Sequence, residues 1–171
     1  MHTPVEKTFD VIVIGAGPGG EGASMEATKQ GKRVGVIERM TQIGGACTHL
    51  ATIPSKSLRA AIYRLMDVNS APMFRQLGIN LEVSFRDLRR SAQSVIEQQV
   101  GMRRSFYDRN DVEVLHGDAC FLDANRVRVE HQDDSTTIAH AKHFVGARRR
   151  RTGCRGLHRT RRPRGHGLGT R

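Results

Sequence analysis

The sequence predicts an α/β fold built around a parallel β-sheet, and three consecutive segments carry the prediction. A β-branched run over residues 9–14 stops at a glycine, and a second apolar run covers residues 34–37; each is typical of a strand buried on both faces. Between them, residues 17–30 are rich in Gly, Ala and Glu and end before Gly31, which suits a helix C-terminus. Strand, helix and strand within about thirty residues form the βαβ unit of doubly wound sheets.

The following segments predict a loop, two more helices and several short strands. Residues 39–54 are loop-like, whereas residues 55–67 and 84–110 have helical periodicity with one apolar face each. The apolar face of the first helix is Leu58, Ile62, Leu65 and Met66. The apolar stripe of the second, which we expect to pack in the core, is Phe85, Leu88, Ala92, Val95, Ile96, Gln99, Met102 and Phe106. Short strands, expected to add a small antiparallel section to the sheet, fall at residues 112–116, 119–122, 127–130 and 138–145.

Composition limits the class of protein. The chain has 171 residues, of which 37% are hydrophobic and 5% aromatic, enough for one domain with a modest core. It contains no run of 18 apolar residues, and its first ten residues do not resemble a signal peptide. Three widely spaced cysteines do not suggest a secreted disulfide framework. We therefore expect a cytoplasmic protein without membrane contact.

The positive net charge of +11 comes from one end of the chain. Ten of the 28 Lys and Arg side chains fall in residues 146–171, all of them Arg and with no acid among them, which leaves 18 basic against 17 acidic side chains in residues 1–145. We therefore divide the chain into a domain of residues 1–145 and an Arg/Gly-rich tail of residues 146–171. The tail has too few apolar residues to offset the entropy of ordering, so we expect it to be disordered.

A glycine motif links the first predicted strand to the first predicted helix. Gly15-Ala16-Gly17-Pro18-Gly19-Gly20 matches G-x-G-x-x-G, and Glu38 follows at the end of the second strand. In this context the motif predicts a dinucleotide site, with the pyrophosphate at the helix N-terminus and a ribose diol on the glutamate. A carboxylate at this position repels a 2′-phosphate, so we do not expect NADP in this site.

A second segment carries a resemblance to a known family. Residues 44–47 read G-G-A-C, and residues 53–56 read I-P-S-K. At this spacing after a βαβ unit, they resemble the flavin-contacting helix of the flavoprotein disulfide reductases, class I pyridine nucleotide-disulfide oxidoreductases. The resemblance extends over about residues 8–145. It implies an incomplete Rossmann-like FAD-binding domain, with NAD(P) bound by a second domain further along the chain and homo-oligomers formed by a dimerisation domain.

The segment departs from the family pattern at residue 52. Thr52 stands where the second redox cysteine is expected, and a dithiol needs two sulfurs whose Cα atoms lie about 5–6 Å apart. Cys120, in a distant predicted strand, is not expected to replace it. The pattern C-T-H-x-x-T-I-P-S-K is similar to that of the family's transhydrogenases, which implies hydride transfer from NADPH to FAD and then to NAD⁺. Another family oxidoreductase without the dithiol is the alternative.

The resemblance also implies roles for individual residues. Lys56 would lie near the reactive flavin nitrogen, where a cation stabilises negative charge on reduced flavin; the alternative is a surface lysine. Cys47 and Thr48 would lie beside the flavin, although a free cysteine is as often a small packing residue. The implied cofactor-binding residues are Gly15, Gly17, Pro18, Gly19, Gly20, Glu38, Arg39, Gly44, Gly45, Ala46, Cys47, Thr48, Lys56, Gly117 and Ala119. The histidines lack metal-ligand spacing, so we expect no metal.

The tail does not continue the family pattern. After Val145 the family pattern would read I-A-T-G-S-x-P, whereas this chain reads Gly146-Ala147-Arg148-Arg149-Arg150. Our hypothesis is a shift of reading frame near residue 146, which would leave a truncated chain without transhydrogenase activity of its own. The alternatives are a non-functional fragment and a genuine tail that binds nucleic acid. The tail has no interleaved aromatic residues, which disfavours nucleic-acid binding.

Overall fold

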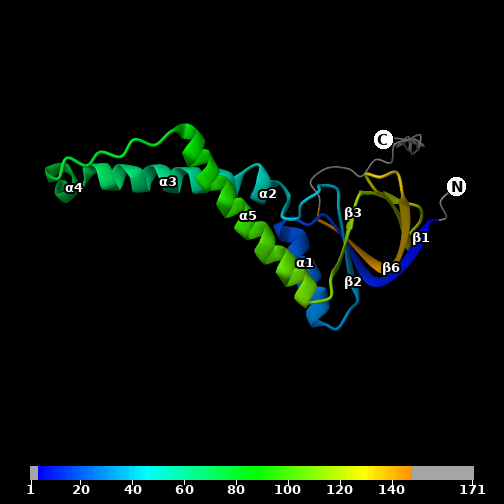
Figure 1. Ribbon diagram of the computed structural model, residues 1–171. Helices are drawn as coiled ribbons and strands as arrows, with labels where there is room; N and C mark the ends of the chain where they lie inside the picture. The colour runs from blue at the N-terminus through cyan, green and yellow to red at the C-terminus, as the bar shows by residue number, and fades with distance from the viewer. Residues whose placement is uncertain (1–3, 148–171) are drawn as a thin grey trace, which may run out of the picture.

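The computed structural model describes residues 4–147. It contains a six-stranded sheet, which is curved and from which a pair of helices extends (Figure 1). The strands are β1 (Val5–Ile14), β2 (Val34–Glu38), β3 (Glu113–His116), β4 (Asp118–Phe121), β5 (Arg126–Glu130) and β6 (Thr136–Gly146). The helices are α1 (Pro18–Lys29), α2 (Gly45–His49), α3 (Thr52–Ser70), α4 (Pro72–Gln76) and α5 (Phe85–Arg109). Apart from residues 146 and 147, the predicted tail lies outside the described residues.

The sheet has the strand order β3-β2-β1-β6-β5-β4. The first four strands in this order are parallel, β5 pairs antiparallel with β6, and β4 pairs antiparallel with β5 at the edge. The predicted α/β fold, with a parallel sheet and a small antiparallel section, is confirmed. Ile14 pairs with both Ile37 and Gly146, so the carboxyl ends of β2, β1 and β6 meet at one edge of the sheet. Ligands of open α/β sheets bind outside this edge.

The central strand β1 is buried on both faces, which explains its continuous apolar sequence. Ile12, fully buried, lies in a cluster with Val127 of β5 on one face. Val13, also fully buried, lies on the other face in a cluster with Met25 of α1 and Tyr107 of α5. The parallel sheet is therefore covered by α1 and α5 on one side and by the antiparallel strands on the other.

The observed elements differ from the predicted ones chiefly around the third helix. The predicted loop of residues 39–54 contains α2 and the first turn of α3, because Pro54 is tolerated in a first turn where its missing N–H is not needed. The short helix α4 begins with a proline, Pro72, and was not predicted from the sequence. The long helix α5 begins after Ser84, whose hydroxyl accepts a hydrogen bond from the Asp87 N–H.

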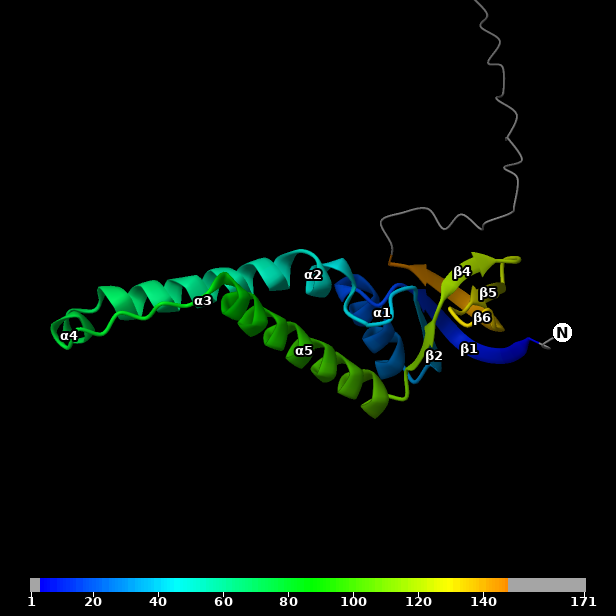
Figure 2. The same cartoon turned by 45° about the horizontal axis from the view of Figure 1, so that its top comes forward.

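The predicted apolar face of α3 is not in the core. The helix has no buried residue, and the side chains of Ile62 and Met66 are 38% and 58% exposed. The prediction for α5 is also partly wrong, because its stripe is buried only at Ala92 and Ile96, whereas Phe85 at its start is 64% exposed. Both views show why: α3, α4 and the start of α5 project away from the sheet (Figures 1 and 2).

Candidate functional site

The turn between β1 and α1 leaves its backbone accessible at the carboxyl edge of the sheet. Gly15 has a φ of +108°, which side-chain-bearing residues rarely adopt. A Cβ on Gly20 would collide with the carbonyl oxygen of Gly15, so this close approach of helix to turn requires glycine. A Cβ on Gly17 would meet only the Cα of Gly45, at 3.9 Å. Gly17 is also the N-cap of α1, and no side chain caps that end, which leaves its first N–H groups available to an anion.

The Glu38 carboxylate ties this turn to the end of β2. It accepts hydrogen bonds from the Ala16 N–H at 2.7 Å and from the Met40 N–H at 2.9 Å, one on each oxygen. The residue is 7% exposed, so these bonds satisfy a nearly buried charge. An ionised carboxylate offers about four acceptor positions. Each oxygen of Glu38 therefore retains acceptor capacity for another donor, such as a hydroxyl.

The segment that leads into α2 packs directly against the glycine turn. The Gly44 N–H donates to the Ala16 carbonyl at 2.9 Å. Gly44 has a φ of +111°, and the following Gly45 lies so close to Gly17 that a Cβ there would come within 2.9 Å of its Cα. Glycine at these positions lets two stretches of backbone touch, and it places the start of α2 beside the start of α1.

These segments surround a hollow of about 520 Å³. Eleven of the fifteen predicted cofactor-binding residues line it, namely Gly15, Gly17, Pro18, Gly19, Glu38, Arg39, Gly45, Ala46, Cys47, Gly117 and Ala119. The volume lies in the range of sites for small molecules and cofactors. The sequence motif, the glutamate and the G-G-x-C segment therefore converge on one site, although they come from separate parts of the chain.

Comparison with known proteins decides the family. Residues 9–167 match the sequence model of the pyridine nucleotide-disulphide oxidoreductases. The chain belongs to this oxidoreductase family. Soluble pyridine nucleotide transhydrogenases of Yersinia pestis (strain Pestoides F) and Yersinia pseudotuberculosis (serotype O:1b, strain IP 31758) are each 48% identical to it over 137 residues. The aligned region is 80% of this chain and 29% of each relative, so the chain spans less than a third of their length.

Four predicted residues of this chain do not line the hollow. Gly20 and Gly44 serve the close backbone contacts around it, and Thr48 is fully buried, with its hydroxyl unpartnered among the described residues. Lys56 is exposed on α3 and does not line the hollow. Its role beside a flavin stays a prediction.

The structure separates the cysteine at the site from its histidine neighbour. Cys47 lines the hollow as a free thiol. The His49 ring hydrogen-bonds through Nε2 to the Ile43 carbonyl at 2.8 Å, and His49 lines a different hollow. The first residue of α3 is Thr52, at the position where a dithiol member of the family carries its second sulfur. A Cys47–Thr52 pair offers one thiol, so it cannot close a disulfide.

An ion pair controls the charge at the start of α1. Glu21 lies in the first turn of the helix, near the place where an anion would bind. Its carboxylate accepts a hydrogen bond from Arg103 Nε of α5 at 2.9 Å, with the side chains 26% and 16% exposed respectively. Because the guanidinium neutralises Glu21, this acid does not repel an anion at the helix N-terminus. One turn further along α5, burial raises the pKa of Tyr107 above its ordinary value of 10.0.

Some lining residues carried no signal in the sequence. Met40, Leu50 and Ala147 line the hollow but belong to no motif. Ala147 lies at the hollow because the sheet extends past residue 145. Strand β6 ends at Gly146, and the Ala147 N–H donates to the Ile14 carbonyl at 3.0 Å. Only the pairing of β6 with β1 shows that this residue reaches the site.

Two further findings concern metals and membranes. In residues 4–147, no group of three or more His, Cys, Asp or Glu side chains is arranged to hold a metal ion. Over the same residues, no helix has both the length and the apolar character needed to cross a bilayer.

Proposed function

We propose that this chain is the FAD-binding part of a soluble pyridine nucleotide transhydrogenase. The observation that carries the proposal is the single hollow shared by the glycine turn, the Glu38 carboxylate and the start of α2. The name and 48% identity of the Yersinia relatives support the choice of transhydrogenase within the family. We further propose that the whole protein is cytoplasmic and, like members of its family, a homo-oligomer.

The chemistry of the residues that line the hollow suits an FAD molecule. The uncapped N-terminus of α1 offers N–H groups to the pyrophosphate, and the missing side chain of Gly17 lets the phosphates approach. The remaining acceptor positions of Glu38 suit the ribose diol of the adenosine. Gly117 and Ala119 would lie against the adenine, and Ala46 and Cys47 beside the isoalloxazine.

The chemistry of the reaction would be supplied by the cofactor. FAD held here would supply hydride transfer between NADPH and NAD⁺, and the protein would provide position and electrostatics. The residues of this chain would bind the pyrophosphate, orient the adenosine, and, at Lys56, stabilise negative charge near the flavin. We propose that both nicotinamide nucleotides bind outside residues 4–147.

The lone thiol at the site favours transhydrogenation over disulfide reduction. Cys47 is the free cysteine of the hollow, and Thr52 cannot replace the second sulfur. Because Cys47 and Thr52 could not relay electrons to a disulfide, a flavin held here would need an acceptor other than a disulfide. A second nicotinamide nucleotide is such an acceptor.

The addition of a single methyl group at residue 17 tests the proposed FAD site. Gly17 has a φ of −78°, which any residue adopts, and a Cβ there finds space in the protein but points toward the proposed phosphate position. Gly17→Ala should therefore fold normally and bind FAD at least about 10-fold more weakly. Gly22→Ala on the same helix, where a Cβ meets nothing within 4 Å, is the matched control and should bind FAD like the parent chain. Quenching of flavin fluorescence measures the affinity.

Two results would contradict the FAD proposal. One is equal FAD affinity of the Gly17→Ala and Gly22→Ala proteins. The other is a folded parent chain that neither retains nor takes up flavin. The transhydrogenase proposal has its own test on the full-length relatives, which should reduce an NAD⁺ analogue with NADPH and leave disulfide substrates untouched. Disulfide reduction at a comparable rate would reject that choice within the family.

A further inference from the structure

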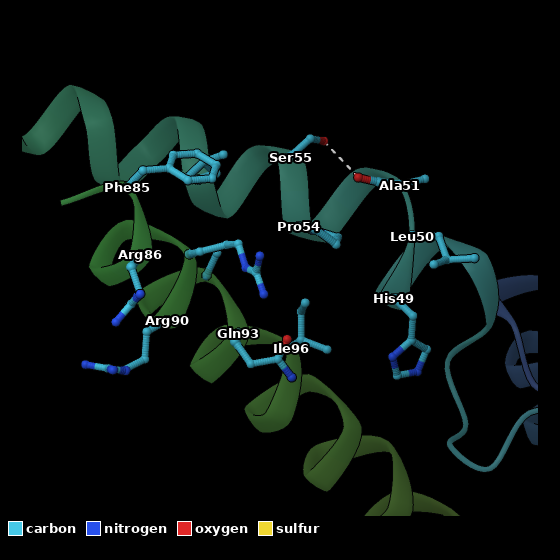
Figure 3. Close-up of a pocket in the computed structure, with 13 residues that line it drawn as sticks. His49, Leu50, Ala51, Pro54, Ser55, Phe85, Arg86, Arg90, Gln93 and Ile96 are labelled. Atoms are coloured by element: carbon cyan, nitrogen blue, oxygen red, sulfur yellow. Dashed lines mark hydrogen bonds between the residues drawn. The ribbon is translucent and has the colours of Figure 1, made fainter.

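The irregular segment between β2 and α2 is held in place by two histidine rings. Within residues 4–147, no backbone–backbone hydrogen bond involves residues 39–43. His116 Nδ1 of β3 lies 3.0 Å from the Met40 carbonyl oxygen, and His49 Nε2 of α2 lies 2.8 Å from the Ile43 carbonyl oxygen. Because a carbonyl oxygen only accepts, both ring nitrogens donate. Figure 3 shows His49 at the α2 end of the hollow between α3 and α5.

Met40 connects the His116 ring to the Glu38 carboxylate. The Met40 N–H donates to Glu38 Oε1 at 2.9 Å, while the Met40 carbonyl accepts the hydrogen bond from His116. The other carboxylate oxygen, Oε2, is held by the Ala16 N–H of the glycine turn. One of the two N–H groups that hold Glu38 therefore belongs to the sheet-bound turn, and the other belongs to a residue that His116 anchors.

His116 is itself held firmly at the end of β3. Its Cα pairs with that of Glu38 in the parallel register, and the following Gly117 N–H donates to the Glu38 carbonyl at 2.9 Å. The His116 carbonyl accepts a hydrogen bond from His131 Nδ1 at 2.6 Å, and His131 Nε2 lies 2.7 Å from the hydroxyl of the buried Thr137. A series of short contacts thus connects β6 to the Glu38 carboxylate.

The position of His116 limits how it can act on a ligand. Glu38 and Met40 line the glycine hollow, but His116 does not. The ring can therefore influence a ligand there only through these two residues. A carboxylate that accepts one N–H on each oxygen has little freedom to rotate, so its remaining acceptor positions keep one direction. Functional side chains need such support from the residues behind them to hold a productive geometry.

We infer that His116 is a positioning residue for the adenosine half of the proposed FAD site: its Nδ1–H anchors Met40, so that the Glu38 carboxylate keeps the orientation in which it accepts the ribose hydroxyls. This inference rests on the proposed function. It assigns the effect to a donor at one atom, so a side chain with an N–H at the same position should replace the ring. It also assigns the effect to the ribose, so a ligand without the hydroxyl should not sense the ring.

Calorimetric titration of the chain with ADP and with 2′-deoxy-ADP tests this inference. The parent chain should prefer ADP at least about 10-fold, because Glu38 accepts a hydrogen bond from the 2′-hydroxyl. His116→Gln places its amide one bond too far from the backbone and should reduce the preference below about 3-fold. His116→Asn carries an amide nitrogen at the Nδ1 position and should keep the preference. His49→Asn removes the ring contact at Ile43, at the far end of the segment, and is the matched control with the preference of the parent chain.

The ratio of the two affinities separates positioning from a merely structural role. Both ligands are compared on the same protein, so a partial loss of fold lowers both affinities and leaves their ratio unchanged. An unchanged ratio in His116→Gln would overturn the inference, as would an equal loss of preference in His116→Asn or in His49→Asn. These results would leave the FAD proposal standing. A folded parent chain that binds neither nucleotide, or binds both equally, would instead reject the proposed role of Glu38 and this inference with it.

Discussion

The sheet of this chain has a buried hydrophobic core, whereas the pair of helices that extends from it does not. We call residues 52–91, which comprise α3, α4 and the start of α5, the helical arm. Between Ile43 and Ala92 no hydrophobic side chain is buried, while the strands on either side contribute fully buried residues such as Ile12 and Val127. Both segments have regular apolar periodicity. Periodicity therefore specifies the type of element, but not whether a partner covers its apolar face.

The packing difference should appear most strongly in paired truncations of the same residue type. Ile12→Ala in β1 removes a fully buried side chain and should lower the free energy of unfolding by about 2–5 kcal/mol. Ile62→Ala in the arm, where the side chain is 38% exposed, should cost less than about 1 kcal/mol. Urea unfolding of the two variants measures both values. Equal losses would mean that the arm is packed as firmly as the sheet.

The ion pair between α1 and α5 beside the sheet should contribute more to stability than the ion pair in the helical arm. Arg103→Gln leaves Glu21 without its partner at a partly buried contact and should destabilise by about 1 kcal/mol. Arg90→Gln in the arm breaks an ion pair whose side chains are 76% and 52% exposed, and should change stability by less than about 0.5 kcal/mol. In the double variant E21Q/R103Q, the loss should be smaller than in Arg103→Gln alone. A double-mutant cycle by urea unfolding detects the coupling, and strict additivity would exclude it.

The smallest expected effect concerns alkaline pH. Burial raises the pKa of Tyr107 in the folded state above 10.0, so the unfolded chain releases this proton first and stability falls as pH rises beyond about 10. Tyr107→Phe should remove the contribution of Tyr107 to this loss of stability and leave the pH dependence of stability below about pH 9 unchanged. Tyr63→Phe, on the exposed face of the arm, is the control and should leave the whole profile unaltered. The free energies of unfolding of the parent chain and of both variants, measured across this pH range, test the prediction.

The parts of the site that follow from local backbone chemistry were predictable from the sequence. The glycine turn, Glu38 and the G-G-x-C segment each impose a constraint within a few residues, and they meet at one hollow. The neighbours that line the site from elsewhere, Leu50 and Ala147, depend on how distant elements pack. The exposure of Phe85 was missed for the same reason: the stripe on α5 is longer than the surface available to bury it.

The position of β1 in the sheet has a consequence for the order of folding. Its neighbour on one side, β2, begins twenty residues after β1 ends, but its neighbour on the other side, β6, ends at residue 146. During synthesis, the first strand must therefore wait with an open hydrogen-bonding edge until nearly all of the described chain has left the ribosome. Long-range parallel pairing of this kind is slow and exposes the nascent strand to aggregation.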